Sequence, residues 1–124
     1  MGRFDGVLLA SDFDNTLIYT EDALRSDEPV PPLSRENREA LEWFMAEGGR
    51  FAIATGRALA ALVKYVDQVP MNAPGVVCNG AALYDFARGE YLEMAMLDGD
   101  VRERGPAVLE KFPSAAVEAY PIDH

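Results

Sequence analysis

The chain has 124 residues, 49% of them hydrophobic, and a formal net charge of −10 at pH 7. That length and composition suit one packed domain better than a disordered chain. With only 11 Lys and Arg residues the chain fits a nucleic-acid partner poorly, because binding to phosphate backbones depends on cationic side chains. The sequence shows no apolar stretch of membrane-spanning length, no leader and a single cysteine. It therefore predicts a soluble cytoplasmic protein without a membrane partner.

The first third of the chain predicts one strand and one helix. Residues 7–11 form a nearly continuous apolar run, the pattern of a strand covered on both faces. Residues 18–32 are polar and rich in proline, so we expect no regular structure there. Ser34 is a typical N-cap for a helix that ends at Gly48-Gly49. One face of that helix carries Ala40, Leu41, Phe44 and Met45.

The middle of the chain repeats this alternation. Residues 50–54 and 75–78 predict two further strands, and the helix between them has an apolar stripe of Leu59, Leu62, Val63 and Val66. Alternating strands and helices indicate a parallel sheet with right-handed crossovers. Ligands of such sheets bind beyond the carboxyl ends of the strands. Asp12, Thr55 and Asn79 each follow one of the three apolar runs.

The pattern changes after Asn79-Gly80. Residues 81–84 and 90–96 predict a hairpin closed by residues 85–89. Residues 98–111 have helical composition, but Gly105-Pro106 predicts a break or kink, and residues 116–120 predict a short strand. We therefore divide the chain into residues 1–84 and 85–124.

Asp12 and Asp14 come directly after the first apolar run. Charge at the end of a buried strand is costly, which indicates chemistry there: one aspartate as nucleophile, the other as proton donor, and a metal ion between them and a phosphate. Two carboxylates so close cannot both ionise cheaply unless a cation lies beside one of them. Loop capping is the structural alternative. A calcium loop is excluded because Leu17 stands where the sharp turn requires glycine.

Three segments together resemble the haloacid dehalogenase superfamily, and within it the Cof-type sugar-phosphate phosphatases. They are Asp12-Phe13-Asp14-Asn15-Thr16, Thr55-Gly56-Arg57 and the run of residues 76–85. The resemblance implies an α/β fold: residues 1–84 would form the amino-terminal part of an incomplete Rossmann-like core, and residues 85–124 the start of an α+β cap. It also implies an enzyme that hydrolyses a small phosphorylated metabolite, such as a sugar phosphate, through an aspartyl phosphate.

The resemblance assigns a role to each matching residue. Asp12 would be the nucleophile, and Asp14 would protonate the leaving alcohol and then activate water. The Asp12 carboxylate and the Asp14 carbonyl would bind Mg²⁺. The Thr55 hydroxyl and the Gly56 amide would contact the phosphoryl oxygens. The substrate-side or loop-shaping positions would be Arg57, Asn79 and Gly80.

The sequence departs from the family pattern in two respects. Asn15 replaces the usual glycine, which keeps the turn plausible because asparagine tolerates a left-handed backbone. The family's third-motif lysine is missing, because the only lysines, Lys64 and Lys111, do not follow a later core strand. The fourth-motif acidic pair is missing too, because Arg104 stands where the segment Asp98-Gly99-Asp100 would need a further acidic residue. We therefore expect the first half of such an enzyme, weakly active or inactive alone. The alternatives are a non-catalytic remnant that binds phosphate or metal, and an interaction protein completed by self-association or by the missing carboxyl-terminal half.

Overall fold

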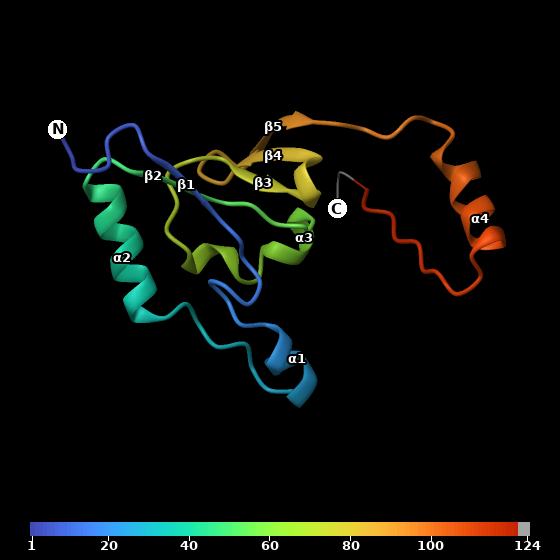
Figure 1. The fold of residues 1–124 in the computed structure, drawn as a ribbon, viewed down its shortest axis with the longest axis horizontal. Helices are drawn as coiled ribbons and strands as arrows, with labels where there is room; N and C mark the ends of the chain where they lie inside the picture. The colour runs from blue at the N-terminus through green and yellow to red at the C-terminus, as the bar shows by residue number, and fades with distance from the viewer. Residues whose placement is uncertain (122–124) are drawn as a thin grey trace. The chain divides into compact units, whose positions relative to one another are not determined.

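The first three strands of the chain run parallel to one another, and the last two pair antiparallel with their neighbours. A computed structural model describes residues 1–121 and shows β1 (Leu8–Ser11) pairing in parallel with β2 (Arg50–Ile53). A parallel bridge between Ala54 and Val76 links β2 to β3 (Gly75–Val77). The predicted parallel arrangement of the first three strands is confirmed (Figure 1). All three strands run the same way, so their carboxyl ends share one edge.

The hairpin predicted after the third strand is confirmed. Strand β4 (Ala82–Asp85) pairs antiparallel with β3, and β5 (Glu90–Met94) pairs antiparallel with β4. By its contacts the chain divides into Met1–Met94, which holds all five strands, and Ala95–His124. Residues 122–124 of the predicted segment 85–124 lie outside the described residues.

Helix α2 (Arg35–Ala46) follows its sequence signals closely. The Ser34 side chain accepts a hydrogen bond from the Asn37 amide at 3.2 Å, and Gly48 adopts a φ of +94°, which ends the helix without strain. Leu41 is buried against the core, whereas Ala40, predicted on the same face, is exposed. Helix α2 contacts β2 (Figure 1).

The second predicted helix is shorter than its apolar stripe suggested. Helix α3 (Leu59–Leu62) is one turn long, and a 3₁₀ turn, Val66–Gln68, follows it. Leu62 and Val66 are buried, but Val63 is 54% exposed, so its place in the predicted stripe is wrong. Val63 itself still has helical φ and ψ, and its amide donates to the Leu59 carbonyl, so its exposure is not due to the end of the helix.

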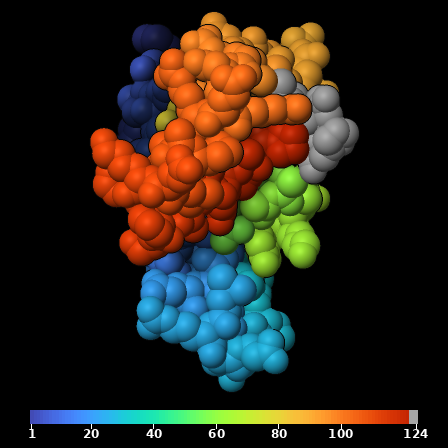
Figure 2. Space-filling view, turned by 90° about the vertical axis from the view of Figure 1, so that its right-hand side faces the viewer, coloured from blue at the N-terminus to red at the C-terminus, as the bar shows by residue number. Residues whose placement is uncertain are grey.

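The expectation of no regular structure over residues 18–32 is also wrong, because α1 (Glu21–Ser26) lies inside it. Acidic residues stand in its first turn, Arg25 pairs with Glu21 at 2.6 Å, and Ala23 is buried. Figures 1 and 2 show α1 (light blue) at the lower end of the first unit.

Strand β1 contradicts the prediction of a strand covered on both faces. Leu8 is 65% exposed, and Val7 and Leu9 are each 45% exposed. Among the described residues β1 pairs with β2 alone, so its other edge has no strand beside it. The core lies instead around β2 and the loops at the sheet edge, and its fully buried large side chains are Phe13, Phe51, Ile18, Ile53, Leu62 and Val77.

The second unit contains α4 (Val101–Lys111). Of the break or kink predicted at Gly105-Pro106, the break is wrong: the helix continues through Pro106, whose fixed φ is compatible with a helix and which removes one backbone donor. Residues 116–120 form no strand, contrary to prediction, and within the described residues no strand pairs with them. None of the helices in residues 1–121 has the length and apolar character needed to cross a membrane.

Candidate active site

The carboxyl edge of the parallel strands carries a hollow. It is lined by Asp12, Ala54, Thr55, Gly56, Val76, Asn79 and Gly80. Asp12 follows β1, Thr55 follows β2, and Asn79 lies in the turn after β3. The fold therefore brings together five of the seven residues that the sequence singled out. The other two, Asp14 and Arg57, pair with each other outside this lining.

The loop after β1 exposes Asp12 and buries other side chains of the same loop. Phe13 and Ile18 are fully buried, and Asp12 is exposed between β1 and Phe13. The Thr16 hydroxyl donates a 2.9 Å hydrogen bond to Asp12 Oδ2. Asn15 has a φ of 59°, so the left-handed backbone expected at this position is confirmed. The turn thus fixes one carboxylate oxygen of Asp12 and leaves the side chain at the surface of the hollow.

Thr55 connects the tips of β2 and β3. Its amide donates to the Val76 carbonyl at 2.9 Å, and its carbonyl accepts from the Asn79 amide at 3.1 Å. The Thr55 hydroxyl accepts a 3.1 Å hydrogen bond from the Arg57 amide. Thr55 is buried, so these contacts fix its hydroxyl beside the hollow.

Gly56 lies where two segments approach closely. A Cβ at this position would lie 2.7 Å from the Asn79 Oδ1 atom. A larger residue at position 56 would displace the Asn79 side chain. The turn after β3 and the Thr55-Gly56 backbone therefore form one continuous wall of the hollow.

The turn after β3 has an unusual backbone. Cys78, Asn79 and Gly80 all have positive φ values, of 52°, 55° and 96°. Such a conformation costs energy at Cys78 and persists only where surrounding contacts hold it. Here the Cys78 amide donates to the Arg57 carbonyl at 2.9 Å, and the Asn79 amide donates to Thr55. Cys78 is half-buried within this turn.

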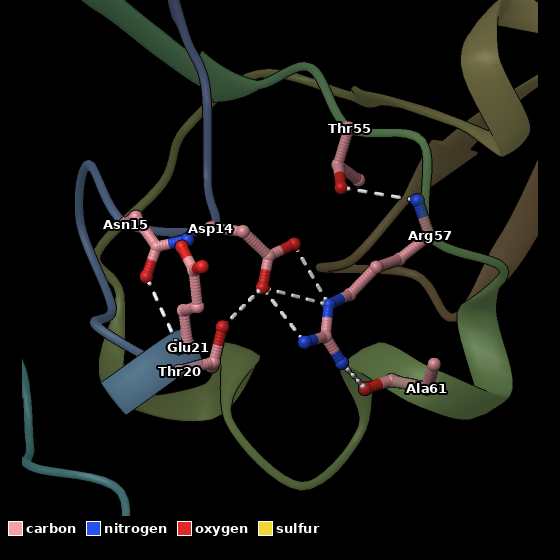
Figure 3. Close-up of polar contacts among 7 residues, drawn as sticks. All are labelled: Asp14, Asn15, Thr20, Glu21, Thr55, Arg57 and Ala61. Carbon is pink, nitrogen blue, oxygen red and sulfur yellow. Dashed lines mark hydrogen bonds and ion pairs between the residues drawn. The ribbon is translucent and has the colours of Figure 1, made fainter. Parts of the chain in front are cut away.

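Asp14 is held by Arg57 and Thr20, as Figure 3 shows. Arg57 Nη2 lies 2.7 Å from Asp14 Oδ1, and Arg57 Nε lies 2.8 Å from Oδ2. The hydrogen bonds from Arg57 lower the pKa of Asp14, partial burial opposes this, and the Thr20 hydroxyl lowers it further. In return the Asp14 carboxylate raises the pKa of Arg57. This arrangement stabilises the ionised form of Asp14.

Thr20 is the residue that sequence reasoning missed. It is buried, and its hydroxyl donates to Asp14 Oδ1 at 2.8 Å. No local pattern signals this contact, because Thr20 stands in a segment expected to be irregular. The 43-residue separation between Asp14 and Arg57 likewise gives no pattern in the sequence.

A metal ion at this edge would find few protein ligands among the described residues. Among residues 1–121, no three His, Cys, Asp or Glu side chains are placed to hold a metal ion together. The Asp12 carboxylate and the Asp14 carbonyl offer hard oxygen donors. Such donors suit Mg²⁺, which commonly keeps several waters and uses only one or two carboxylates. The donor chemistry therefore fits Mg²⁺ as a partial site.

Comparison with solved structures shows the same fold in longer proteins. A phosphatase of the haloalkanoate superfamily from Bacteroides thetaiotaomicron matches with a TM-score of 0.68 and 23% identity, over 86% of this chain and 36% of that one. A haloacid dehalogenase-like hydrolase from B. subtilis matches with a TM-score of 0.61 and 23% identity, over 86% and 33%. A subclass IIB sugar phosphatase matches with a TM-score of 0.56 and 23% identity, over 85% and 37%. The chain thus spans about a third of the length of each.

The comparison with curated proteins found no match. The sequence pattern of the haloacid dehalogenase-like hydrolases matches residues 9–115, which include the strand tips and all the predicted site residues. The chain therefore belongs to the haloacid dehalogenase-like hydrolase family.

Proposed function

We propose that this chain carries the nucleophilic half of a Cof-type phosphatase that hydrolyses a small phosphorylated metabolite, such as a sugar phosphate. One observation carries the proposal: Asp12 shares a hollow with Thr55 and Gly56. A carboxylate nucleophile and phosphoryl-binding groups must converge in this way for an aspartyl phosphate to form. The sugar phosphatase among the solved structures supports the substrate class.

Asp12 and Asp14 divide the two steps between them. An Asp12 oxygen attacks phosphorus, the bond from phosphorus to the ester oxygen breaks, and protonated Asp14 gives its proton to the leaving alcohol. Asp14, now ionised, takes a proton from water, whose oxygen then attacks phosphorus and releases phosphate from Asp12. Arg57 and Thr20 stabilise the ionised form of Asp14, which favours the second step and opposes the protonated form that the first step needs.

The remaining wall of the hollow binds the substrate. The Thr55 hydroxyl and the Gly56 amide donate to phosphoryl oxygens as charge builds on them. The substrate-side positions are Asn79 and Gly80, which line the hollow.

The cofactor we propose is Mg²⁺, held by the Asp12 carboxylate and the Asp14 carbonyl. When bound, the ion neutralises phosphoryl charge. Asp12 and Asp14 by themselves leave most positions around the ion to water and substrate. We therefore expect this chain alone to be a poor catalyst, about 10²- to 10³-fold slower for each electrostatic group that it lacks.

We further propose that residues 1–84 belong to the phosphatase core and residues 85–124 to the start of the cap. The single cysteine favours the cytoplasm as the setting.

A second candidate is an interaction protein whose sheet is completed by another chain or by a carboxyl-terminal half. The exposure of Val7, Leu8 and Leu9 favours it, because an apolar strand with a free edge invites pairing. A stable assembly of this chain without phosphatase activity would favour this second candidate.

The test is Asp12→Asn in the full gene product that carries this chain. We expect Mg²⁺-dependent release of phosphate from an aryl phosphate to fall to background, because a neutral amide cannot attack phosphorus. Asp67→Asn is the matched control, since Asp67 is exposed and lies outside the hollow. Turnover by Asp12→Asn equal to that of the control would overturn the proposal.

A further inference from the structure

The Asp14 carboxylate is fixed at both oxygens. Arg57 Nε lies 3.0 Å from Oδ1 and 2.8 Å from Oδ2, Arg57 Nη2 lies 2.7 Å from Oδ1, and Thr20 Oγ1 lies 2.8 Å from Oδ1. A planar guanidinium matches a carboxylate in this forked geometry, so it sets the orientation of the group as well as its position. Figure 3 shows the two side chains pointing at each other, with Thr20 on the same side of Asp14 as α1.

Arg57 is itself fixed at several points. Its Nη1 atom donates to the Ala61 carbonyl at 3.2 Å, and its guanidinium carbon lies 5.7 Å from the centre of the Tyr65 ring. Its backbone is held on one side by Thr55 and on the other by Cys78. Its side chain is only 24% exposed. These contacts therefore hold the Arg57 side chain in one conformation, unlike that of a solvent-exposed arginine.

Arg57 contacts Asp14, whereas the lining of the hollow includes Asp12 and Thr55 but not Arg57. We infer that Arg57 and Thr20 are positioning residues that hold the Asp14 carboxylate in one orientation for proton transfer. This inference rests on the proposed function. It gives Arg57 a role that acts through Asp14, in place of the direct substrate contact that its motif position suggested.

The first test measures how the effect of Arg57→Ala depends on the leaving group. Good leaving groups such as dinitrophenolate need no proton, whereas alkyl alcohols do. In the full gene product we expect Arg57→Ala to lower kcat/KM, which reports the step that releases the alcohol, by about 10- to 100-fold for an alkyl phosphate and by less than about twofold for dinitrophenyl phosphate. An equal loss for both esters would overturn the inference and indicate a contact between Arg57 and the phosphoryl group.

A double-mutant cycle separates the same two roles. In an Asp14→Asn background we expect Arg57→Ala to cause no further loss with the alkyl ester, since the group that it positions is gone. Independent, multiplying losses would contradict the inference. Affinity for inorganic phosphate, measured by calorimetry, should change less than twofold in Arg57→Ala, and a loss of about tenfold would again indicate direct contact.

Two matched pairs serve as controls. Thr20→Val removes the hydroxyl and should show the leaving-group dependence, whereas Thr20→Ser keeps it and should restore activity. Arg35→Ala removes an exposed arginine paired with Glu39 and should change no rate. If Asp12→Asn leaves turnover intact, the proposed function fails. If turnover depends on Asp12 but Arg57→Ala acts equally on every ester, this inference alone fails.

Discussion

Strand β1 and the loop that follows it are covered very differently. Leu8 in the strand is 65% exposed, whereas Phe13 and Ile18 in the loop are fully buried. The loop residues belong to the same apolar cluster as Phe51 and Ile53 of β2. The site loop is therefore anchored by its own side chains and by β2, and only weakly by the faces of β1. Candidate catalytic geometry can form here although β1 pairs on one side only among residues 1–121.

The largest expected effect concerns the loop after β1 and is a loss of catalytic rate. Asp14→Asn should slow hydrolysis of esters with poor leaving groups by about 10²- to 10⁴-fold, because it removes the proton donor while the buried loop residues stay in place. The measurement is kcat/KM for a series of esters, which reports the step that releases the alcohol, with Asp67→Asn as the control. A uniform loss across the series would show that Asp14 serves the fold of the loop and not proton transfer.

The next effect tests whether the loop contributes more to stability through packing than β1 does. Phe13→Ala should lower the free energy of unfolding by about 3–5 kcal/mol, because it empties a fully buried site. Leu8→Ala should lower it by less than about 1 kcal/mol, because Leu8 is mostly exposed. Urea denaturation of the two variants measures the difference. Equal losses would show that β1 is buried in solution, for example by another copy of the chain.

The same contrast separates what the sequence predicts from what it does not. The three parallel strands and the hairpin follow from local apolar runs and turn residues, as does the N-cap at Ser34. The exposure of Leu8 could not be predicted in this way. An apolar run shows which residues a strand tends to bury, but it does not show which elements are present to cover them. Val63 fails for a related reason: its backbone is helical, but the apolar stripe does not show which part of the helix surface is covered by other elements.

The site shows a similar division. The positions of Asp12, Thr55 and Asn79 follow from the rule that strand ends meet at one edge. The Asp14–Arg57 fork does not, because a contact between residues 43 positions apart leaves no periodic signal. The buried hydroxyl of Thr20 is likewise visible only once α1 folds beside the loop.

The smallest expected effect concerns this fork. The pKa of Asp14 is lowered in the folded protein from its ordinary value of 3.8, chiefly by the Arg57 hydrogen bonds. The stabilisation that results is fully present above about pH 3.8 and is lost as the pH falls through the lowered folded value. Arg57→Ala should therefore destabilise the protein by no more than about 1 kcal/mol at pH 7, and the difference should shrink below pH 3.8.

Urea denaturation between pH 3 and pH 7 measures this difference. Arg35→Ala is the control, because its ion pair with Glu39 is exposed to solvent. A difference between Arg57→Ala and the unsubstituted protein that grows as the pH falls would contradict the assignment of the fork.

The most direct test of the proposed chemistry is to trap the phosphorylated enzyme. The full gene product is mixed with substrate and Mg²⁺, quenched in acid, reduced with borohydride and digested, and the peptide that contains residues 12–14 is analysed by mass spectrometry. An acyl phosphate is reduced to an alcohol, so we expect the reduced product at Asp12, dependent on substrate and lost in Asp12→Asn. Reduction at Asp14 or at no residue of this peptide, in a protein that releases phosphate at its normal rate, would contradict Asp12 as the nucleophile.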